Sequence, residues 1–125
     1  MEFLSTYGLT CKSEIPSMGQ SVDVVAIDSE RVIAVEVKLH NWRRALEQCI
    51  PHKSVADYVV IVLAKKALPD ELAHAARENG VGIVLFDHQA GSFRMPIRPK
   101  RSETIWQPQR KVFLSRFHEI SNAVN

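Results

Sequence analysis

The stretch VDVVAIDSERVIAVEVKL, residues 22–39, decides how this chain folds. It contains two runs rich in β-branched residues, 22–27 and 32–39, separated by the polar tetrapeptide DSER at 28–31. Two such runs around a short polar segment are typical of an antiparallel β-hairpin. Both faces of the second run begin with apolar side chains, so we expect this strand to lie inside a sheet and not at a solvated edge.

Predicted strands and helices alternate on either side of this hairpin. Before it we expect a helix over 1–7 and a strand over 9–15; after it a helix over 41–50, a strand over 58–64, a helix over 68–79, strands over 81–86 and 92–97, and a helix over 109–120. A strand, a helix and a second buried strand in succession indicate a parallel crossover. We therefore expect one α/β domain over residues 1–125, with helices on both faces of a mixed sheet in which a central antiparallel hairpin precedes a parallel β-α-β crossover.

Composition excludes several classes of protein. The chain has 125 residues, of which 46% are hydrophobic and 24% charged, as in an ordinary globular domain. No apolar run is long enough to cross a bilayer and the first residues lack a secretory signal, so we expect a cytoplasmic protein without a membrane partner. No glycine-rich phosphate loop is present, so we expect no nucleotide cofactor.

The two cysteines, Cys11 and Cys49, form no CxxC pair, and we expect neither a disulfide scaffold nor a cysteine-rich zinc site. A weaker alternative is a zinc site in which Cys49 and His52 are joined by His40 or Cys11.

Charge is distributed unevenly along the chain. Residues 1–93 carry 9 basic and 12 acidic side chains, whereas residues 94–116 carry 7 basic side chains and one acid. We interpret this as a core over about 7–90 followed by a basic extension over about 94–125. An acidic body with a basic extension can bring phosphates close to acidic, metal-binding groups, and a solvated basic tail is the alternative.

The hairpin also carries a candidate metal site. Pairing Ile27 with Val32 places Asp23 directly opposite Glu36. Two facing carboxylates repel, and Mg²⁺ bound between them removes the repulsion, while Lys38 on the same face can reach a metal-bound water or a phosphate oxygen. Two alternatives remain open: a Glu36–Lys38 salt bridge on an exposed face, or a one-residue slip of the hairpin that removes the pairing.

At these residues the chain resembles the PD-(D/E)XK nuclease superfamily, which includes restriction endonucleases, Holliday junction resolvases and RecB-like nucleases. The resemblance covers about residues 7–65 and consists of Asp23 on one hairpin strand, Glu36-Val37-Lys38 on the next, and the helix and apolar strand that follow. It implies a restriction-endonuclease-like fold and a Mg²⁺-dependent nuclease, with Mn²⁺ as a substitute, that hydrolyses DNA.

The resemblance also implies roles for individual residues. Asp23, Glu36 and the backbone carbonyl of Val37 would hold the metal, with Glu2 or Glu14 as the candidate third acid, and Lys38 would orient or deprotonate the attacking water. Gln48 matches a glutamine that RecB-like members place near the site, although His52 stands where a tyrosine usually follows it. The candidate phosphate contacts are Arg43, Arg44, Arg98, Lys100 and Arg101.

Two other functions remain open at this point. The domain could be a catalytically inactive nuclease-fold module that binds nucleic acid or a protein partner, or a small-molecule-binding α/β domain with a closed apolar pocket. Relatives of this fold often form homodimers, so a homodimer is a further expectation.

Overall fold

The computed structural model describes residues 10–17, 20–28, 30–38 and 41–120. In this part of the chain the elements are β1 (Thr10–Ser17), β2 (Gln20–Asp28), β3 (Arg31–Lys38), α2 (Trp42–Cys49), the 3₁₀ turn η1 (Ile50–Ser54), β4 (Tyr58–Leu63), α3 (Asp70–Asn79), β5 (Gly82–Asp87), β6 (Ser92–Ile97) and α4 (Gln107–Glu119). The predicted helix over 1–7 lies outside the described residues. No described helix has the length and apolar character needed to cross a membrane.

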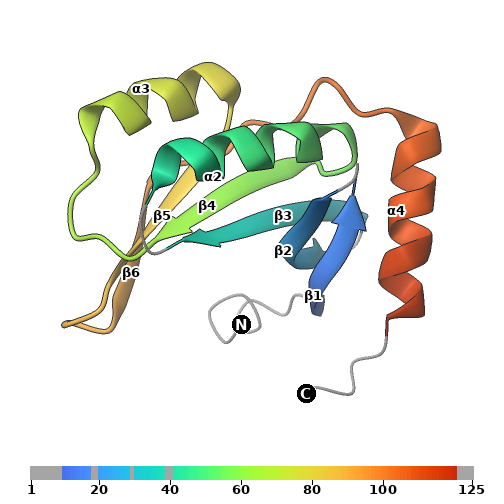
Figure 1. Cartoon of the computed structure of the whole chain (residues 1–125), viewed down its shortest axis with the longest axis horizontal. Helices are drawn as coiled ribbons and strands as arrows, with labels where there is room; N and C mark the ends of the chain where they lie inside the picture. Colours follow the sequence, from blue (N-terminus) through green and yellow to red (C-terminus); the bar gives the residue numbers. More distant parts are fainter. Residues whose placement is uncertain (1–9, 18–19, 29, 39–40, 121–125) are drawn as a thin grey trace.

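All six described strands form one sheet in the order β1-β2-β3-β4-β5-β6 (Figure 1). Strands β1, β2 and β3 are an antiparallel meander, β3, β4 and β5 run parallel, and β6 is antiparallel to β5. Helix α2 connects β3 to β4 and α3 connects β4 to β5. The prediction of a mixed sheet with an antiparallel hairpin followed by a parallel β-α-β crossover is therefore confirmed for β4-α3-β5, and β3-α2-β4 is a second parallel connection.

The hairpin register agrees with the sequence prediction. Ile27 pairs with Val32 and Asp28 pairs with Arg31, so the polar tetrapeptide forms the tight end of the hairpin and the alternative one-residue slip is wrong. At the open end the last pair of the ladder is Val24 with Val35. Asp23 and Glu36 are next in this register, at the point where regular pairing between the two strands stops.

The two faces of the sheet bury separate apolar clusters. Val32 and Ala34 of β3 pack with the buried faces of α2 and α3, which lie together over the sheet in Figure 1. The other face carries a cluster of valines, Val24, Val35, Val60, Val62 and Val84. The expectation of helices on both faces is not met within the described residues, because every buried helical side chain there belongs to the first cluster.

The basic C-terminal stretch packs into this domain. Phe113 and Phe117 of α4 are buried in the same cluster as β1, α2 and α3. Lys12 of β1 holds the end of α4: its Nζ donates to the Phe117 carbonyl at 2.7 Å and lies 4.5 Å from the Phe117 ring centroid. A cation at the carboxyl end of a helix also interacts favourably with the helix dipole.

The helix after β3 ends differently from the sequence prediction. Asn41 is its N-cap as expected, and the Asn41 side chain accepts a hydrogen bond from the Arg44 N–H. The helical conformation does not end at Pro51. Pro51 lies in the first turn of η1, where its missing N–H costs no hydrogen bond. The 3₁₀ turn continues the chain towards the sheet and carries His52 into the interior.

Candidate active site

The candidate residues lie at one end of the sheet, where β3 and β4 finish. Glu36 pairs with Ile61 and Lys38 with Leu63 in the parallel ladder. Because side chains alternate along a strand, Glu36 and Lys38 share the face on which Ala34 meets the helices. An acid and a lysine therefore project from the covered face of a central strand.

Asp23 is bonded directly to the backbone of β3. Its Oδ2 accepts a hydrogen bond from the Val37 N–H at 3.0 Å, and the Asp23 side chain is half-buried. In an antiparallel arrangement the N–H and C=O of one residue point towards the same neighbouring strand. The Val37 carbonyl oxygen therefore faces the same side as the Asp23 carboxylate.

Glu36 has a partner that the sequence did not predict. It is only 3% exposed, and its Oε1 lies 3.2 Å from Nε2 of the fully buried His52. A salt bridge to Lys38, the alternative left open above, is not formed. Lys38 is half-buried, and its side chain makes no hydrogen bond or ion pair with any other residue that the structure describes.

Three oxygen atoms near the ends of β2 and β3 are of the kind that could bind a hard divalent cation. Asp23 Oδ1 and Glu36 Oε2 have no hydrogen-bond partner among the described residues, and carboxylate and carbonyl oxygens, such as that of Val37, are ligands that Mg²⁺ prefers. Residues 10–17, 20–28, 30–38 and 41–120 contain no group of three or more His, Cys, Asp or Glu side chains that could hold a metal. The remaining Mg²⁺ ligands would then be waters and substrate oxygens.

Within the described residues, no third acid completes a metal-binding group with Asp23 and Glu36. Glu2 lies outside the described residues. Glu14 is exposed, and its φ of 57° interrupts β1 between the pairs Ser13–Val24 and Ile15–Val22. The strand is thus irregular at Glu14, opposite the position of Asp23.

In the structure His52, and not Gln48, contacts the candidate site. Gln48 is half-buried on α2 and makes no side-chain hydrogen bond to another residue that the structure describes. His52 makes the contact with Glu36 instead. The sequence did contain an indication of this contact. Cys49 lies on the predicted apolar face of the helix, and His52, three residues later, would lie on the same face of a helical turn.

The zinc alternative joining both cysteines is wrong. Cys49 is buried in the cluster beneath α2, whereas Cys11 packs against the valine cluster on the opposite face of the sheet. Cys49 Sγ donates to the Leu46 carbonyl at 3.3 Å. His40 lies outside the described residues.

Burial makes Cys49 an unreactive thiol. Desolvation, followed by the nearby Glu36 charge, raises the pKa of Cys49 from 9.0 to about 12. Its thiolate fraction at neutral pH therefore falls about a thousandfold, since each pKa unit is a factor of ten. We expect a disulfide reagent at pH 8 to label Cys49 at least about a hundredfold more slowly than Cys11, measured by mass spectrometry.

The sign of the effect on stability follows from the same shift. A group whose pKa is higher in the folded state stabilises the fold fully below its unfolded pKa, and this contribution is lost as the pH rises through the folded value. We therefore expect stability to fall between about pH 9 and 12, and less steeply in Cys49→Ala. In the labelling experiment, equal rates for Cys49 and Cys11 would contradict the buried position of Cys49.

The predicted phosphate-binding residues divide between the two ends of the sheet. Arg43 and Arg44 lie in the first turn of α2, which follows β3, and are therefore at the same end of the sheet as Lys38. Arg43 forms an ion pair with Glu71 and lies 4.4 Å from the Trp42 ring centroid, whereas Arg44 is exposed and its side chain has no partner in the described part of the chain.

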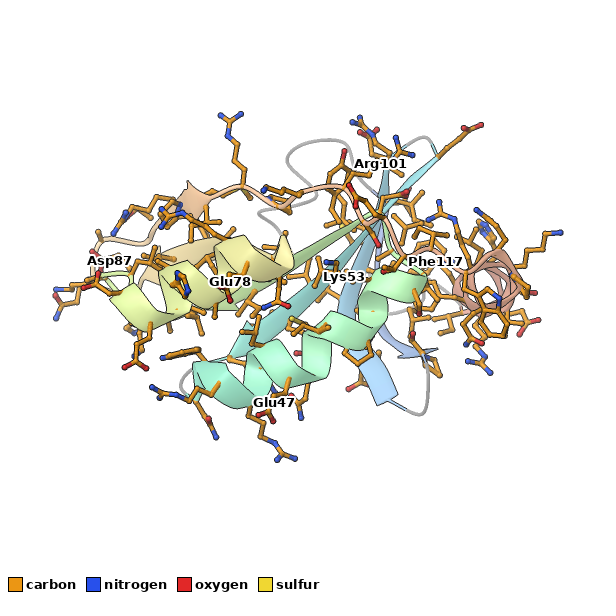
Figure 2. All side chains as sticks on the ribbon, turned by 90° about the horizontal axis from the view of Figure 1, so that it is seen from above. Glu47, Lys53, Glu78, Asp87, Arg101 and Phe117 are labelled. Carbon is orange, nitrogen blue, oxygen red and sulfur yellow. The ribbon has the colours of Figure 1, made fainter. Side chains whose placement is uncertain are left out.

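Lys100 and Arg101 lie at the opposite, amino end. The Lys100 N–H bonds to the Gly80 carbonyl, and Arg101 lies 3.5 Å from Asp57, which is bonded to Val32 at the start of β3. Val32 and Glu36 are about 13 Å apart along the strand. Figure 2 shows that the two ends of the sheet are well separated: Asp87, at the carboxyl end of β5, lies far from Arg101.

Arg98 is also distant from the candidate site. It follows β6, an edge strand that is three strands away from β3 in the sheet.

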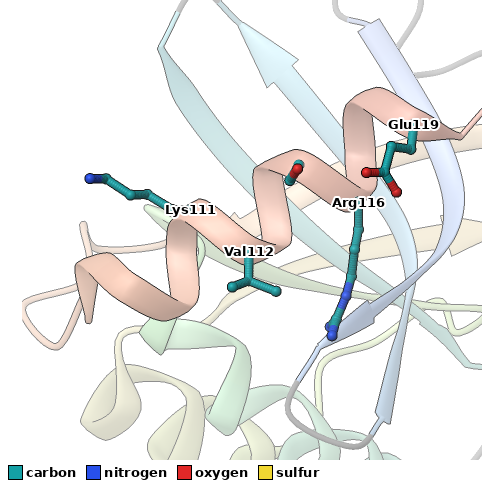
Figure 3. A pocket seen from close by; sticks show the side chains of 5 residues that line it. Lys111, Val112, Arg116 and Glu119 are labelled. Atoms are coloured by element: carbon teal, nitrogen blue, oxygen red, sulfur yellow. The ribbon is translucent and has the colours of Figure 1, made fainter.

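A shallow hollow of about 440 Å³ lies elsewhere, on the outer side of α4 (Figure 3). Its walls are Lys111, Val112, Ser115, Arg116 and Glu119. None of these residues belongs to the candidate active site.

Comparison of the chain with protein-family models, with curated proteins and with solved structures found no match. The fold and the site define the class only as an α/β domain with a six-stranded mixed sheet.

Proposed function

We propose that this protein is a Mg²⁺-dependent phosphodiesterase that hydrolyses DNA, with the restriction-endonuclease-like fold of the PD-(D/E)XK superfamily. The sheet order supports the fold, because an antiparallel meander is followed by a parallel crossover through α2. The observation that carries the function is the hydrogen bond from the Val37 N–H to Asp23. It brings an acid on β2 next to the Glu36-Val37-Lys38 segment where the two strands part.

Asp23, Glu36 and the Val37 carbonyl would hold the cation. When bound, Mg²⁺ supplies Lewis-acid polarisation of the scissile phosphate and charge stabilisation in the transition state. The oxygen of a water would form the new bond to phosphorus as the bond from phosphorus to one sugar oxygen breaks, and the leaving sugar oxygen would take a proton from solvent water. Lys38 orients or deprotonates this water and stabilises the developing negative charge. The Lys38 side chain, which has no partner among the described residues, is free for this role: as an ammonium it can orient the water and stabilise charge, and only as a neutral amine can it take the proton of the water.

The expected effect of removing Lys38 tests the proposal. Wild-type protein should cleave labelled duplex, single-stranded or four-way-junction DNA with Mg²⁺ or Mn²⁺ and should lose this activity in EDTA. Lys38→Ala should lower the cleavage rate about a hundredfold or more, the usual contribution of a positioned proton-transfer group. Lys65→Ala is the matched control, because Lys65 is also half-buried and follows β4 at the same end of the sheet. Equal rates for the two variants would refute the role of Lys38.

The DNA backbone should contact the end of the sheet that carries Lys38. We expect Arg44→Ala to weaken DNA binding and to reduce the slope of log affinity against log salt by about 1, because one phosphate contact is lost. Lys100→Ala removes one exposed cation at the other end and should leave the slope unchanged. Fluorescence anisotropy at several salt concentrations measures the affinity and the salt slope of both variants. A larger change of the slope in Lys100→Ala than in Arg44→Ala would place the DNA at the amino end of the parallel strands.

One observation favours the second candidate, a nuclease-fold module without catalysis. Glu36 is only 3% exposed and is already bonded to His52, so a cation must compete for a buried carboxylate. Wild-type protein that binds DNA but cleaves no substrate form with Mg²⁺ or Mn²⁺ would establish the module and exclude the enzyme.

A further inference from the structure

We infer that His52 is a positioning residue for the metal site: its imidazole fixes the Glu36 carboxylate so that the free oxygen of Glu36 can bind the cation. The inference rests on the proposed function, in which Glu36 is a metal ligand. It assigns a role to η1, an element that carries none of the metal ligands proposed above.

The contact is buried and exclusive. His52 is fully buried and Glu36 is 3% exposed, with Nε2 and Oε1 separated by 3.2 Å. No other described residue bonds to either side chain. A carboxylate removed from water in this way is held mainly by the one donor that faces it.

The pairing with Glu36 also determines which ring nitrogen of His52 carries a proton. Donation to a carboxylate requires the proton on Nε2, and Nδ1 is buried without a hydrogen-bond partner. A leucine would fill the same interior position without leaving an unpaired nitrogen. The contact with Glu36 is therefore the polar interaction that a histidine provides here.

The backbone of η1 holds the ring in place. The His52 carbonyl accepts hydrogen bonds from the N–H groups of Val55 at 3.1 Å and Ala56 at 2.8 Å. Pro51 restricts the preceding residue, Ile50, which packs against the apolar cluster that includes the buried face of α2. His52 is thus rigidly placed before any cation arrives.

Anchoring one oxygen of Glu36 leaves Oε2 with a defined direction. Hydrogen-bond partners of metal-binding carboxylates act in this way, and their loss typically weakens metal affinity 10- to 100-fold. This effect differs from that of a purely structural contact, which would change folding and leave metal affinity unaltered.

Mn²⁺ binding at fixed pH tests the inference, with free Mn²⁺ measured by electron paramagnetic resonance. We expect His52→Leu to raise the Mn²⁺ dissociation constant about 10- to 100-fold. His52→Gln, which can still donate to Glu36, should restore the constant to within about threefold. In His52→Leu the metal concentration that gives half-maximal cleavage should rise by the same factor, while the cleavage rate at saturating metal should return to that of the wild type.

The outcomes separate the two claims. Wild type and His52→Leu that bind Mn²⁺ equally would overturn the role of His52 and leave the proposed function standing. Wild type that binds no Mn²⁺ would overturn both. If His52→Leu does not fold, His52→Asn is the second variant: its shorter side chain cannot reach Glu36 as Nε2 does, so unchanged affinity in folded His52→Asn would likewise overturn the role.

Discussion

Replacing Asp57 with alanine should lower the free energy of unfolding by about 3–5 kcal/mol, because it leaves a largely buried cation without its carboxylate partner. The Asp57 side chain is 5% exposed and its Oδ2 lies 3.1 Å from Arg110, which is itself 13% exposed. The same oxygen accepts a hydrogen bond from the Val32 N–H at 2.8 Å. The exposed Arg101 adds little, since surface ion pairs are weak.

This network explains how the C-terminal stretch is held. Arg110 also donates to the carbonyls of Val55 and Glu30, and the Ser102 N–H donates to the Asp57 carbonyl. Loss of Asp57 therefore weakens the contact between α4 and the amino ends of β3 and β4.

Urea denaturation of wild type, Asp57→Ala and Asp57→Asn measures the effect. Asp57→Asn keeps an acceptor for Val32 and should lose less stability than Asp57→Ala. Asp28→Ala is the control, because the Asp28–Arg31 pair is exposed and should contribute no more than about 1 kcal/mol. Similar losses for Asp57→Ala and Asp28→Ala would contradict the buried network.

Asp23→Asn should reduce metal-dependent cleavage at least about a thousandfold. Removing one of the two proposed carboxylate ligands would cost several kcal/mol of charge stabilisation, and about 4 kcal/mol corresponds to three powers of ten in rate. The fold should survive, because the asparagine side-chain oxygen can still accept the Val37 hydrogen bond.

Asp28→Asn is the matched control on the same strand. It removes a carboxylate at the other end of β2 and should leave the cleavage rate unchanged. Single-turnover rates and circular dichroism separate loss of chemistry from loss of fold. Normal cleavage by Asp23→Asn would remove Asp23 from the site.

Sequence periodicity predicted a mixed sheet and the favoured register of its central hairpin, although a one-residue slip remained open until the structure. The β-branched runs of 22–27 and 32–39 alternate their side chains around a short polar segment, and the pairing of Ile27 with Val32 follows directly. The same reasoning placed Asp23 next to the Glu36 segment.

The buried polar partners could not be predicted in this way. The residues that bond to Asp57 lie far from it in sequence, and local patterns carry no information on such contacts. The Glu36–His52 pair likewise joins residues 16 positions apart through a 3₁₀ turn, where the sequence indicated a helix stop at Pro51. Net charge predicted a basic extension but could not show that Lys100 and Arg101 lie at the opposite end of the sheet from Lys38.

A crystal structure with Mn²⁺, using the anomalous signal of the metal, tests the central claim most directly. We expect one peak at coordination distance from the carboxylates of Asp23 and Glu36 and the carbonyl of Val37, next to Lys38. A structure with no peak at these atoms, in which Glu36 bonds only to His52 and Asp23 only to Val37, would contradict the metal site and the hydrolase together.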